Sequence, residues 1–291
     1  MSVQQALALY TEVLQDQPHV SLSSFARDVD LPYWKLRDAR RHVEQEKARQ
    51  ARQTAHRNQV RDVALANPTY GYRRVQRQLA RQHGQAAPGR HEVRRLLQEL
   101  DLIPAQPKKT RRPSVPILTP LLWPEGRRVQ IDATRFSLTD GAAWVYVVLD
   151  VGSRAVLHLE VVRNLSASSA VTALQTGLQL LHSHGVKESI VVMSDGGSDF
   201  TSQAFRQACE EVGCWIRAKV SQRGGMGILE RVNRNLKYEW IFRQEVRSIT
   251  ELRVQCGQFQ HWYNTQRLHS ALGYAYPWDK LIASAKSLFA A

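Results

Sequence analysis

The residues that decide the fold are Arg128-Val-Gln-Ile-Asp-Ala-Thr-Arg-Phe136, the first of three valine-rich segments in the second half of the chain. The next two segments cover residues 143–150 and 155–162, and turn sequences containing glycine separate all three. Segments of this composition joined by short turns predict antiparallel strands. Farther along, helical patterns at about 166–183 and from about 201 alternate with strands that end at Asp195 and cover 215–218. This order predicts an α/β domain with a mixed five-stranded sheet.

Three carboxylates of this half lie in three different local patterns. Asp132 lies within the first apolar segment, Asp195 closes the run Ile190-Val-Val-Met-Ser-Asp195, and Glu230 opens a helical stretch. Burying one acid in a β-rich region is costly unless something compensates its charge, so three acids indicate bound divalent cations. Hard cations such as Mg²⁺ take carboxylate oxygens together with phosphate oxygens of a substrate. The pattern favours a metal-dependent phosphodiester chemistry.

The helix that begins near Glu230 is expected to have two faces. An apolar stripe runs along one side, and Glu230, Asn233, Arg234 and Lys237 share another because they are spaced at i, i+3, i+4 and i+7. A carboxylate beside an amide and two cations suits a surface that holds a metal next to a polyanion. An ordinary amphipathic surface helix fits the same spacing nearly as well.

Composition excludes several classes of protein. No run approaches the roughly 20 apolar residues of a membrane span, and the polar N-terminus has no secretory pattern. The three cysteines form no CxxC pair, which argues against a zinc site. The net charge of +14 is concentrated in residues 51–128, where 16 basic residues face 5 acidic ones. A basic block of this kind is typical of a nucleic-acid binder, although a solvated basic face without a partner is the alternative.

The first 126 residues predict two helical units and a linker. A short serine-capped helix, a break at Leu31-Pro32 and a basic helix from Tyr33 suggest a helix-turn-helix DNA-binding domain over residues 1–48. Residues 42–66 read as a long polar helix that bridges to a second helix-turn-helix domain over residues 49–103. Residues 104–126 are proline-rich and basic, which predicts an extended linker along a DNA backbone, and residues 127–291 form the α/β domain with a helical tail.

Cationic, amide and aromatic side chains in these regions are the candidate DNA contacts. In the helical units and the linker they are Lys35, Arg37, Arg40, Arg41, Tyr70, Arg73, Arg74, Arg77, Arg94, Arg95, Lys108, Lys109, Arg111 and Arg112. In the α/β domain they are Arg223, Asn233, Arg234, Lys237 and Arg267. The Tyr70 ring is more typical of a core residue than of a base-stacking platform, and a folding role suits Arg267, Asn264 and His269 in the tail as well as DNA contact does.

The order of these motifs resembles the DDE transposases and retroviral integrases, whose catalytic core has an RNase H-like fold. The matching pieces are Ile131-Asp-Ala-Thr134, Ser194-Asp-Gly-Gly-Ser-Asp-Phe-Thr-Ser202 and the stretch from Glu230 to Glu239. The tail from Trp262 to Tyr274 is similar to the closing motif of bacterial insertion-sequence transposases. Pro68-Thr-Tyr-Gly-Tyr-Arg-Arg74 resembles the helix-turn-helix that precedes the core in OrfB-type members. Val129 and Asp199 depart from residues common in relatives, but neither departure removes a proposed ligand.

The resemblance implies an enzyme that binds the ends of a mobile element and joins them to target DNA. Asp132, Asp195 and Glu230 would be its catalytic residues and would hold two Mg²⁺ ions, with Mn²⁺ as a substitute. Its partners would be double-stranded DNA and a second copy of the chain, in a homodimer or higher oligomer without a membrane, in the bacterial cytoplasm at the nucleoid. Two alternatives stay open: a DNA-binding regulator that keeps the core as a scaffold, and a nuclease that cuts without joining.

Overall fold

The computed structural model describes residues 1–104, 124–186, 189–218 and 226–288, and for residues 284–288 the backbone alone. The chain divides into two compact units, Met1–Gln106 and Pro107–Ala291. The predicted linker side chains Lys108, Lys109, Arg111 and Arg112, and also Arg223, lie outside the described residues.

The first unit contains five α-helices among its described residues. They are α1 (Val3–Asp16), α2 (Leu22–Asp28), α3 (Tyr33–Ala66), α4 (Tyr72–His83) and α5 (Arg90–Glu99). Ser2 and Gln5 form a capping box at the start of α1, and the Ser21 hydroxyl accepts from the backbone N–H of Ser24 to cap α2. These polar caps satisfy backbone N–H groups that a helix leaves without an internal partner.

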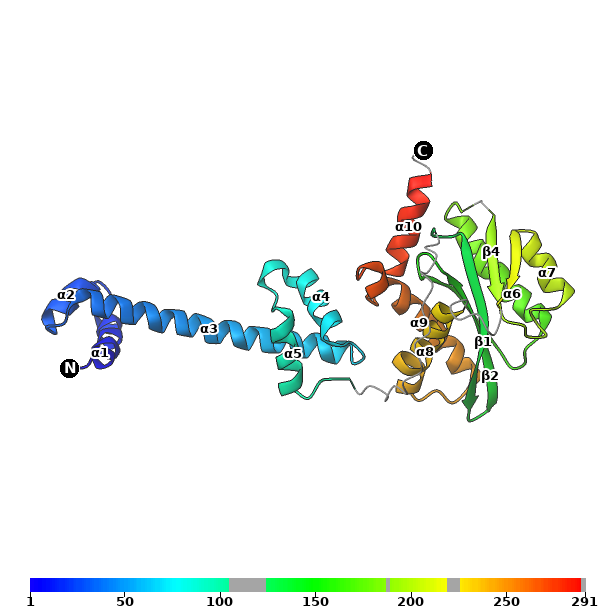
Figure 1. Ribbon diagram of the computed structural model, residues 1–291. Helices are drawn as coiled ribbons and strands as arrows, with labels where there is room; N and C mark the ends of the chain where they lie inside the picture. Colours follow the sequence, from blue (N-terminus) through cyan, green and yellow to red (C-terminus); the bar gives the residue numbers. More distant parts are fainter. Residues whose placement is uncertain (105–123, 187–188, 219–225, 289–291) are drawn as a thin grey trace, which may run out of the picture. The chain divides into compact units, whose positions relative to one another are not determined.

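Helix α3 is one continuous helix of 34 residues. The sequence predicted two helical stretches here, and the proposed domain boundary at 48/49 lies inside α3. Neither proline nor glycine interrupts residues 33–66, so nothing in the sequence ends the helix there. Helices α1 and α2 pack on its first part, and α4 and α5 pack on its last part (Figure 1).

Each end of α3 has its own small core. At the first end, Tyr10, Phe25 and Leu36 are buried together. At the other end, the buried side chains are Val60, Val63, Tyr70, Val75, Leu79, Val93 and Leu97. His56 of α3 also contacts Glu92 of α5, with 2.9 Å between Nδ1 and Oε1. Helix α2, a turn and the longer helix α3 follow in the order predicted for residues 1–48, and the helix-turn-helix role of this part stays a prediction.

The second unit contains a five-stranded mixed sheet, as the sequence predicted. The strands are β1 (Arg128–Leu138), β2 (Gly141–Asp150), β3 (Val156–Val162), β4 (Ile190–Ser194) and β5 (Gly213–Arg217), in the order β3-β2-β1-β4-β5. The first three are antiparallel neighbours, whereas β1–β4 and β4–β5 are parallel pairs. Parallel pairing requires crossover connections, and α6 and α7 supply them.

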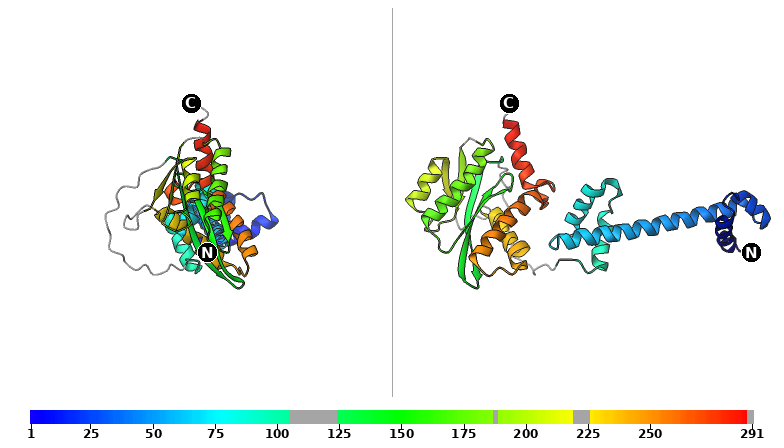
Figure 2. Two further views of the ribbon diagram at one scale, coloured as in Figure 1. Left: turned by 90° about the vertical axis from the view of Figure 1, so that its right-hand side faces the viewer. Right: turned by 180° about the vertical axis from the view of Figure 1, so that it is seen from behind.

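Helices cover both faces of this sheet (Figure 1). On one face, α6 (Ala167–Ser183) and α7 (Gln203–Glu210) enclose a core with Val129, Ile131 and Tyr146. On the other, α8 (Gly227–Asn235) and α9 (Ile249–Thr265) enclose a core with Phe136 and Val147. Alternate residues of β1 therefore face different layers, as strand geometry requires. The reverse view in Figure 2 shows the sheet between α6 and the pair α8 and α9.

The C-terminal tail completes the second core. Asn264 of α9 is buried, accepts from the backbone N–H of Val156 at 2.9 Å and donates to its carbonyl at 2.8 Å. These two bonds satisfy the backbone of β3, which is an edge strand of the sheet. The chain then passes through a left-handed turn at Gly273 into α10 (Pro277–Leu288). Asn264 thus has the folding role that the sequence left open.

Candidate functional site

Two of the predicted acids lie side by side on neighbouring strands. Gln130 of β1 pairs with Met193 of β4 in a parallel register. Continuing that register by two residues places Asp132 beside Asp195, immediately after the last residue of β4. Adjacent strands are about 4.8 Å apart, and residues in register point to the same face. The end of β4 and the middle of β1 therefore bring two carboxylates together.

Helix α8 brings the third acid to the same face. Leu229, Val232 and Leu236 are fully buried in the core beneath α8, which fixes the rotation of the helix. Glu230 then lies in its first turn, and the Asn233 side-chain amide donates to Asp132 Oδ2 at 2.8 Å. Asn233 was predicted to contact DNA, but its amide is engaged with the acid of β1 instead. The other side-chain atom of Asn233, Oδ1, is buried without a hydrogen-bond partner among the described residues.

Asp132 lies in an environment that disfavours its charged form. The pKa of Asp132 is raised to about 6, mainly by burial and also by the charges of Asp195 and Glu230, while the N–H of Ala133 and the Asn233 amide oppose the shift. Burial also lowers the pKa of Lys237, although the negative charge of Asp132 favours its charged form. Asp132 therefore interacts with one acid at the end of β4, one acid on α8 and the Lys237 cation from the turn after α8.

The loop after Asp195 is held by its own polar contacts. The backbone N–H of Gly197 donates to Asp195 Oδ1 at 2.9 Å. Asp199 is buried, and its Oδ2 accepts from the Tyr146 hydroxyl at 2.8 Å. Burial and this carboxylate raise the pKa of Tyr146. The Asp199 carboxylate therefore accepts a hydrogen bond inside the protein and is shielded from solvent.

Arg217 is a feature of the site that the sequence did not predict. A Cβ atom on Gly196 would lie 2.1 Å from Arg217 Nη2, so the exposed guanidinium rests against the backbone next to Asp195. The cause is the sheet register, because Arg217 pairs with Ser194 at the ends of β5 and β4. Pairing across strands cannot be read from the order of residues, so the sequence alone does not predict this position of Arg217.

The carboxylate oxygens of Asp132, Asp195 and Glu230 suit a hard divalent cation, but the three side chains are not close enough together to surround one. In the described ranges no three histidine, cysteine, aspartate or glutamate side chains are close enough together to enclose a metal ion. The chemistry of the site nevertheless fits, because three carboxylates repel one another and an amide oxygen of Asn233 is buried without a partner. A cation would relieve both. The ligand set of Asp132, Asp195 and Glu230 stays a prediction.

The predicted DNA contacts on the helical unit are mostly exposed. Lys35, Arg37, Arg40 and Arg41 are exposed on α3, Arg73 and Arg77 on α4, and Arg94 and Arg95 on α5. Some are paired with acids on the same helix, such as Arg40 with Glu44 at 2.8 Å. Arg74 is half-buried with its guanidinium over the Tyr70 ring. Such exposed pairs are weak, so they leave the cations available to phosphates.

Two predicted contacts are buried and need correction. Tyr70 is 1% exposed, so its ring belongs to the core between α3, α4 and α5 and is closed to DNA. Arg267 is 3% exposed, and it forms a two-pronged ion pair with Glu239 through Nε at 2.6 Å and Nη2 at 2.8 Å. Its Nη1 also lies 3.2 Å from His269 Nε2. These tail residues hold the fold together.

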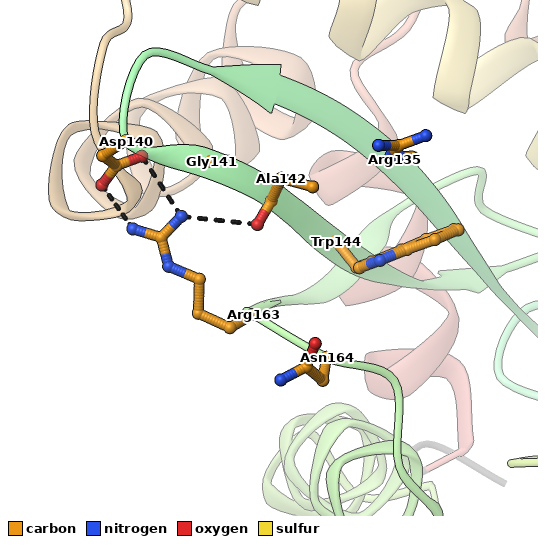
Figure 3. Close-up of a pocket in the computed structure, with 7 residues that line it drawn as sticks. All are labelled: Arg135, Asp140, Gly141, Ala142, Trp144, Arg163 and Asn164. Carbon is orange, nitrogen blue, oxygen red and sulfur yellow. Dashed lines mark hydrogen bonds and ion pairs between the residues drawn. The ribbon is translucent and has the colours of Figure 1, made fainter.

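One hollow in the described surface lies apart from the acids. It has a volume of about 590 Å³ and is lined by Arg135, Asp140, Gly141, Ala142, Trp144, Arg163 and Asn164 (Figure 3). The Arg163 guanidinium is paired with Asp140 there and donates to the Ala142 carbonyl at 3.4 Å. Arg135 and Trp144 face each other across β1 and β2, on the side of the sheet opposite Asp132. This hollow therefore contributes nothing to the acidic site.

Comparison with known families matches three parts of the chain. Two models of the integrase core domain match residues 125–223 and 216–277, and a model of an HTH-like domain matches residues 50–110. The transposase for insertion sequence element IS629 of Shigella sonnei is 24% identical over 259 residues, which cover 84% of this chain and 85% of that protein. The chain belongs to the insertion-sequence DDE transposases with an integrase-like core.

Solved structures of retroviral integrases are more distant. The HTLV-2 integrase catalytic core domain, solved in complex with magnesium, is 18% identical with a TM-score of 0.43 and covers 55% of this chain and 97% of that one. The simian T-cell lymphotropic virus intasome is 18% identical with a TM-score of 0.45 and covers 69% and 68%. This transposase is a polynucleotidyl transferase-type enzyme of DNA transposition, and its HTH-like part implies DNA binding. In the described residues, every helix is too short or too polar to cross a membrane.

Proposed function

We propose that this transposase binds both ends of its element and catalyses Mg²⁺-dependent strand cleavage and strand transfer into target DNA. The observation that carries the proposal is the placement of three acids on one face of the sheet, with Asp195 in register beside Asp132 and Glu230 on α8, whose Asn233 bonds to Asp132. Burial, together with the charges of Asp195 and Glu230, raises the pKa of Asp132 to about 6. Acids that repel one another from separate elements destabilise a protein unless a cation joins them. This arrangement supports a metal-binding role for Asp132, Asp195 and Glu230.

The three acids would hold the cation, and their neighbours would orient the DNA. When bound, Mg²⁺, or Mn²⁺ in its place, supplies positive charge that neutralises the scissile phosphate and activates the attacking hydroxyl. Asp195 and Glu230 are exposed, and a cation would draw their carboxylates toward Asp132, although Asp195 Oδ1 also accepts from the backbone N–H of Gly197. Asn233 keeps Asp132 in place, while Lys237 and Arg234 supply cations for the flanking phosphates. No covalent intermediate with the protein is required.

The same proposal extends to the whole chain. Residues 1–48 and 49–103 would each read DNA through a helix-turn-helix, residues 104–126 would follow the backbone, and residues 127–291 would perform the chemistry. Holding two ends at once supports a homodimer or higher oligomer on double-stranded DNA.

Three single substitutions test the catalytic assignment. Asp132→Asn, Asp195→Asn and Glu230→Gln should each abolish cleavage and joining of DNA that carries both element ends, while end binding is retained. Glu245→Gln is the matched control, because Glu245 is an exposed acid that pairs with Arg247. Full activity in any one of the three variants would remove that residue from the ligand set. Nicked products without joined products from the wild-type protein would favour a nuclease.

A further inference from the structure

An exposed aromatic patch lies on the turn that follows α8. Tyr238 and Phe242 are 63% and 58% exposed, and their ring centroids lie 5.4 Å apart in an edge-to-face arrangement. Phe242 also contacts Phe136 of β1, at 6.2 Å between centroids. Phe136 is only 2% exposed, so we call the two exposed rings, Tyr238 and Phe242, the aromatic patch. Two large rings in water at one place cost free energy that a partner would recover.

The local backbone presents these rings outward. Residues Leu236–Trp240 form a π-helical turn directly after α8. Such a turn inserts an extra residue into the helix and is frequently found at functional sites. Leu236 stays buried in the core, while Tyr238, two residues later, points into solvent.

The aromatic patch lies next to the acids. The Lys237 ammonium is 5.3 Å from the centre of the Phe136 ring, and it also interacts with the charge of Asp132. Phe136 follows Asp132 by four residues on the same face of β1, a separation of about 13 Å at 3.3 Å per residue. The Phe242 ring lies a further 6.2 Å from the Phe136 ring, so this path from Asp132 to the patch is about 19 Å, or about six nucleotides of a DNA strand at 3.4 Å each.

The charges around the patch select the kind of partner. Arg234 and Arg243 are exposed on the same segment, and Lys237 lies between the patch and Asp132. The acids nearby are engaged, because Glu239 pairs with Arg267 and Glu245 with Arg247. Exposed rings surrounded by cations suit a nucleic acid strand, whose bases stack while its phosphates meet the cations. An apolar protein surface would leave those cations without a counter-charge.

We propose that the aromatic patch stacks an unpaired base of the DNA strand held at the acids, within about six nucleotides of the scissile phosphate. The inference rests on the proposed function and adds that the strand opens near the cut. A base within a duplex is covered by its neighbours, so only an unpaired or extruded base offers a face to protein rings.

Photo-crosslinking of the full-length protein tests this directly. The probe is a thymidine dodecamer carrying 5-iododeoxyuridine, compared with the same strand annealed to its complement. We expect crosslinks in the peptide containing Tyr238 and Phe242 for the single strand and few for the duplex. In Tyr238→Ala this crosslink should fall about tenfold, which corresponds to about 1.4 kcal/mol of stacking. Tyr238→Phe keeps the ring and should retain it.

A control variant distinguishes crosslinking at the aromatic patch from crosslinking at other surfaces of the protein. Val254→Ala removes a side chain that is 55% exposed on α9 and serves as the matched control. Equal crosslinking in Tyr238→Ala and wild type, or crosslinks confined to other peptides, would overturn the proposal even if Asp132→Asn abolishes cleavage. A loss of dimer mass in Tyr238→Ala with unchanged crosslinking would assign the patch to a second copy of the chain. A single-strand crosslink that depends on Tyr238 supports the patch even if no joined product forms.

Discussion

Asp132 carries a free-energy penalty that depends on pH. Its pKa is about 6 in the folded protein against an ordinary value of 3.8. Below pH 3.8 both folded and unfolded states are protonated, so no penalty exists. Between pH 3.8 and 6 the unfolded state releases its proton first, and stability falls as the pH rises. Above pH 6 the full penalty applies, at most about 3 kcal/mol for a shift of two pKa units.

The first prediction is therefore that Asp132→Asn stabilises the metal-free protein at neutral pH. Asparagine keeps an oxygen that accepts from Asn233 and removes the charge. In EDTA, the free energy of unfolding in urea should rise by about 1–3 kcal/mol at pH 7.5 and stay unchanged below pH 4. A variant less stable than wild type at pH 7.5 would show that the carboxylate is compensated within the fold.

The second prediction concerns binding of the cation itself. Mg²⁺ should raise the melting temperature of the wild-type protein, because a ligand at 100 times its Kd stabilises the folded state by about 2.7 kcal/mol. Asp132→Asn should abolish this rise, and Glu245→Gln should retain it. Thermal unfolding monitored by circular dichroism across a Mg²⁺ titration measures the effect. An identical rise in all three proteins would place the ion elsewhere.

At the scale of single residues, the sequence predicts where a residue lies when its place depends only on where one strand or helix begins or ends. Asp195 was predictable because a strand ends there, and Glu230 because a helix begins there. Arg217 was not, since its place beside Gly196 follows from the register between β4 and β5. The bond from Asn233 to Asp132 likewise joins residues 101 positions apart, and helix spacing alone does not predict it.

Among the elements, the turn after α8 depends on a buried ion pair. Glu239 lies in the π-helical turn, and Arg267 follows α9, with side chains 18% and 4% exposed. Breaking a buried pair leaves one charge without compensation, which costs about 3–5 kcal/mol. The third prediction is that Arg267→Ala lowers the free energy of unfolding by this amount. Arg234→Ala, at an exposed site, should change it by less than about 0.5 kcal/mol.

The measurement also decides between folding and DNA contact for Arg267. Urea unfolding gives the stability of each variant, and fluorescence anisotropy gives its affinity for a DNA duplex. If Arg267→Ala is as stable as wild type but binds duplex more weakly, the buried pair is dispensable and the contact with DNA is restored as an interpretation.

Elements with a strong pattern were predicted well, and those without one were not. The valine-rich strands and the serine-capped α6 lie within a few residues of their expected bounds. Helix α3 was divided in the prediction because its middle is polar all round, and a helix without an apolar stripe gives no periodic signal. Its continuity follows instead from the absence of any residue that would end it.

For the whole molecule, the charge distribution sets how DNA is bound. The net charge of +14 comes mainly from residues 51–128, and α4 and α5 of that region present exposed arginines. Each phosphate contact releases counterions, so the logarithm of the binding constant falls linearly with the logarithm of salt concentration, by about 0.9 per contact. The sequence could predict this term because it depends on composition and exposure more than on geometry.

The fourth prediction applies that rule to α4 and α5. Arg73→Ala with Arg77→Ala should reduce the salt slope by about 1.8, and Arg94→Ala with Arg95→Ala should do the same, if each arginine meets one phosphate. The loss of affinity should be equal for element-end DNA and for unrelated duplex of the same length, because phosphates carry no sequence information. Anisotropy titrations between low and moderate salt measure both slopes. An unchanged slope would contradict a phosphate contact, whereas a loss confined to element-end DNA would show that these arginines read bases, since base contacts alone distinguish one sequence from another.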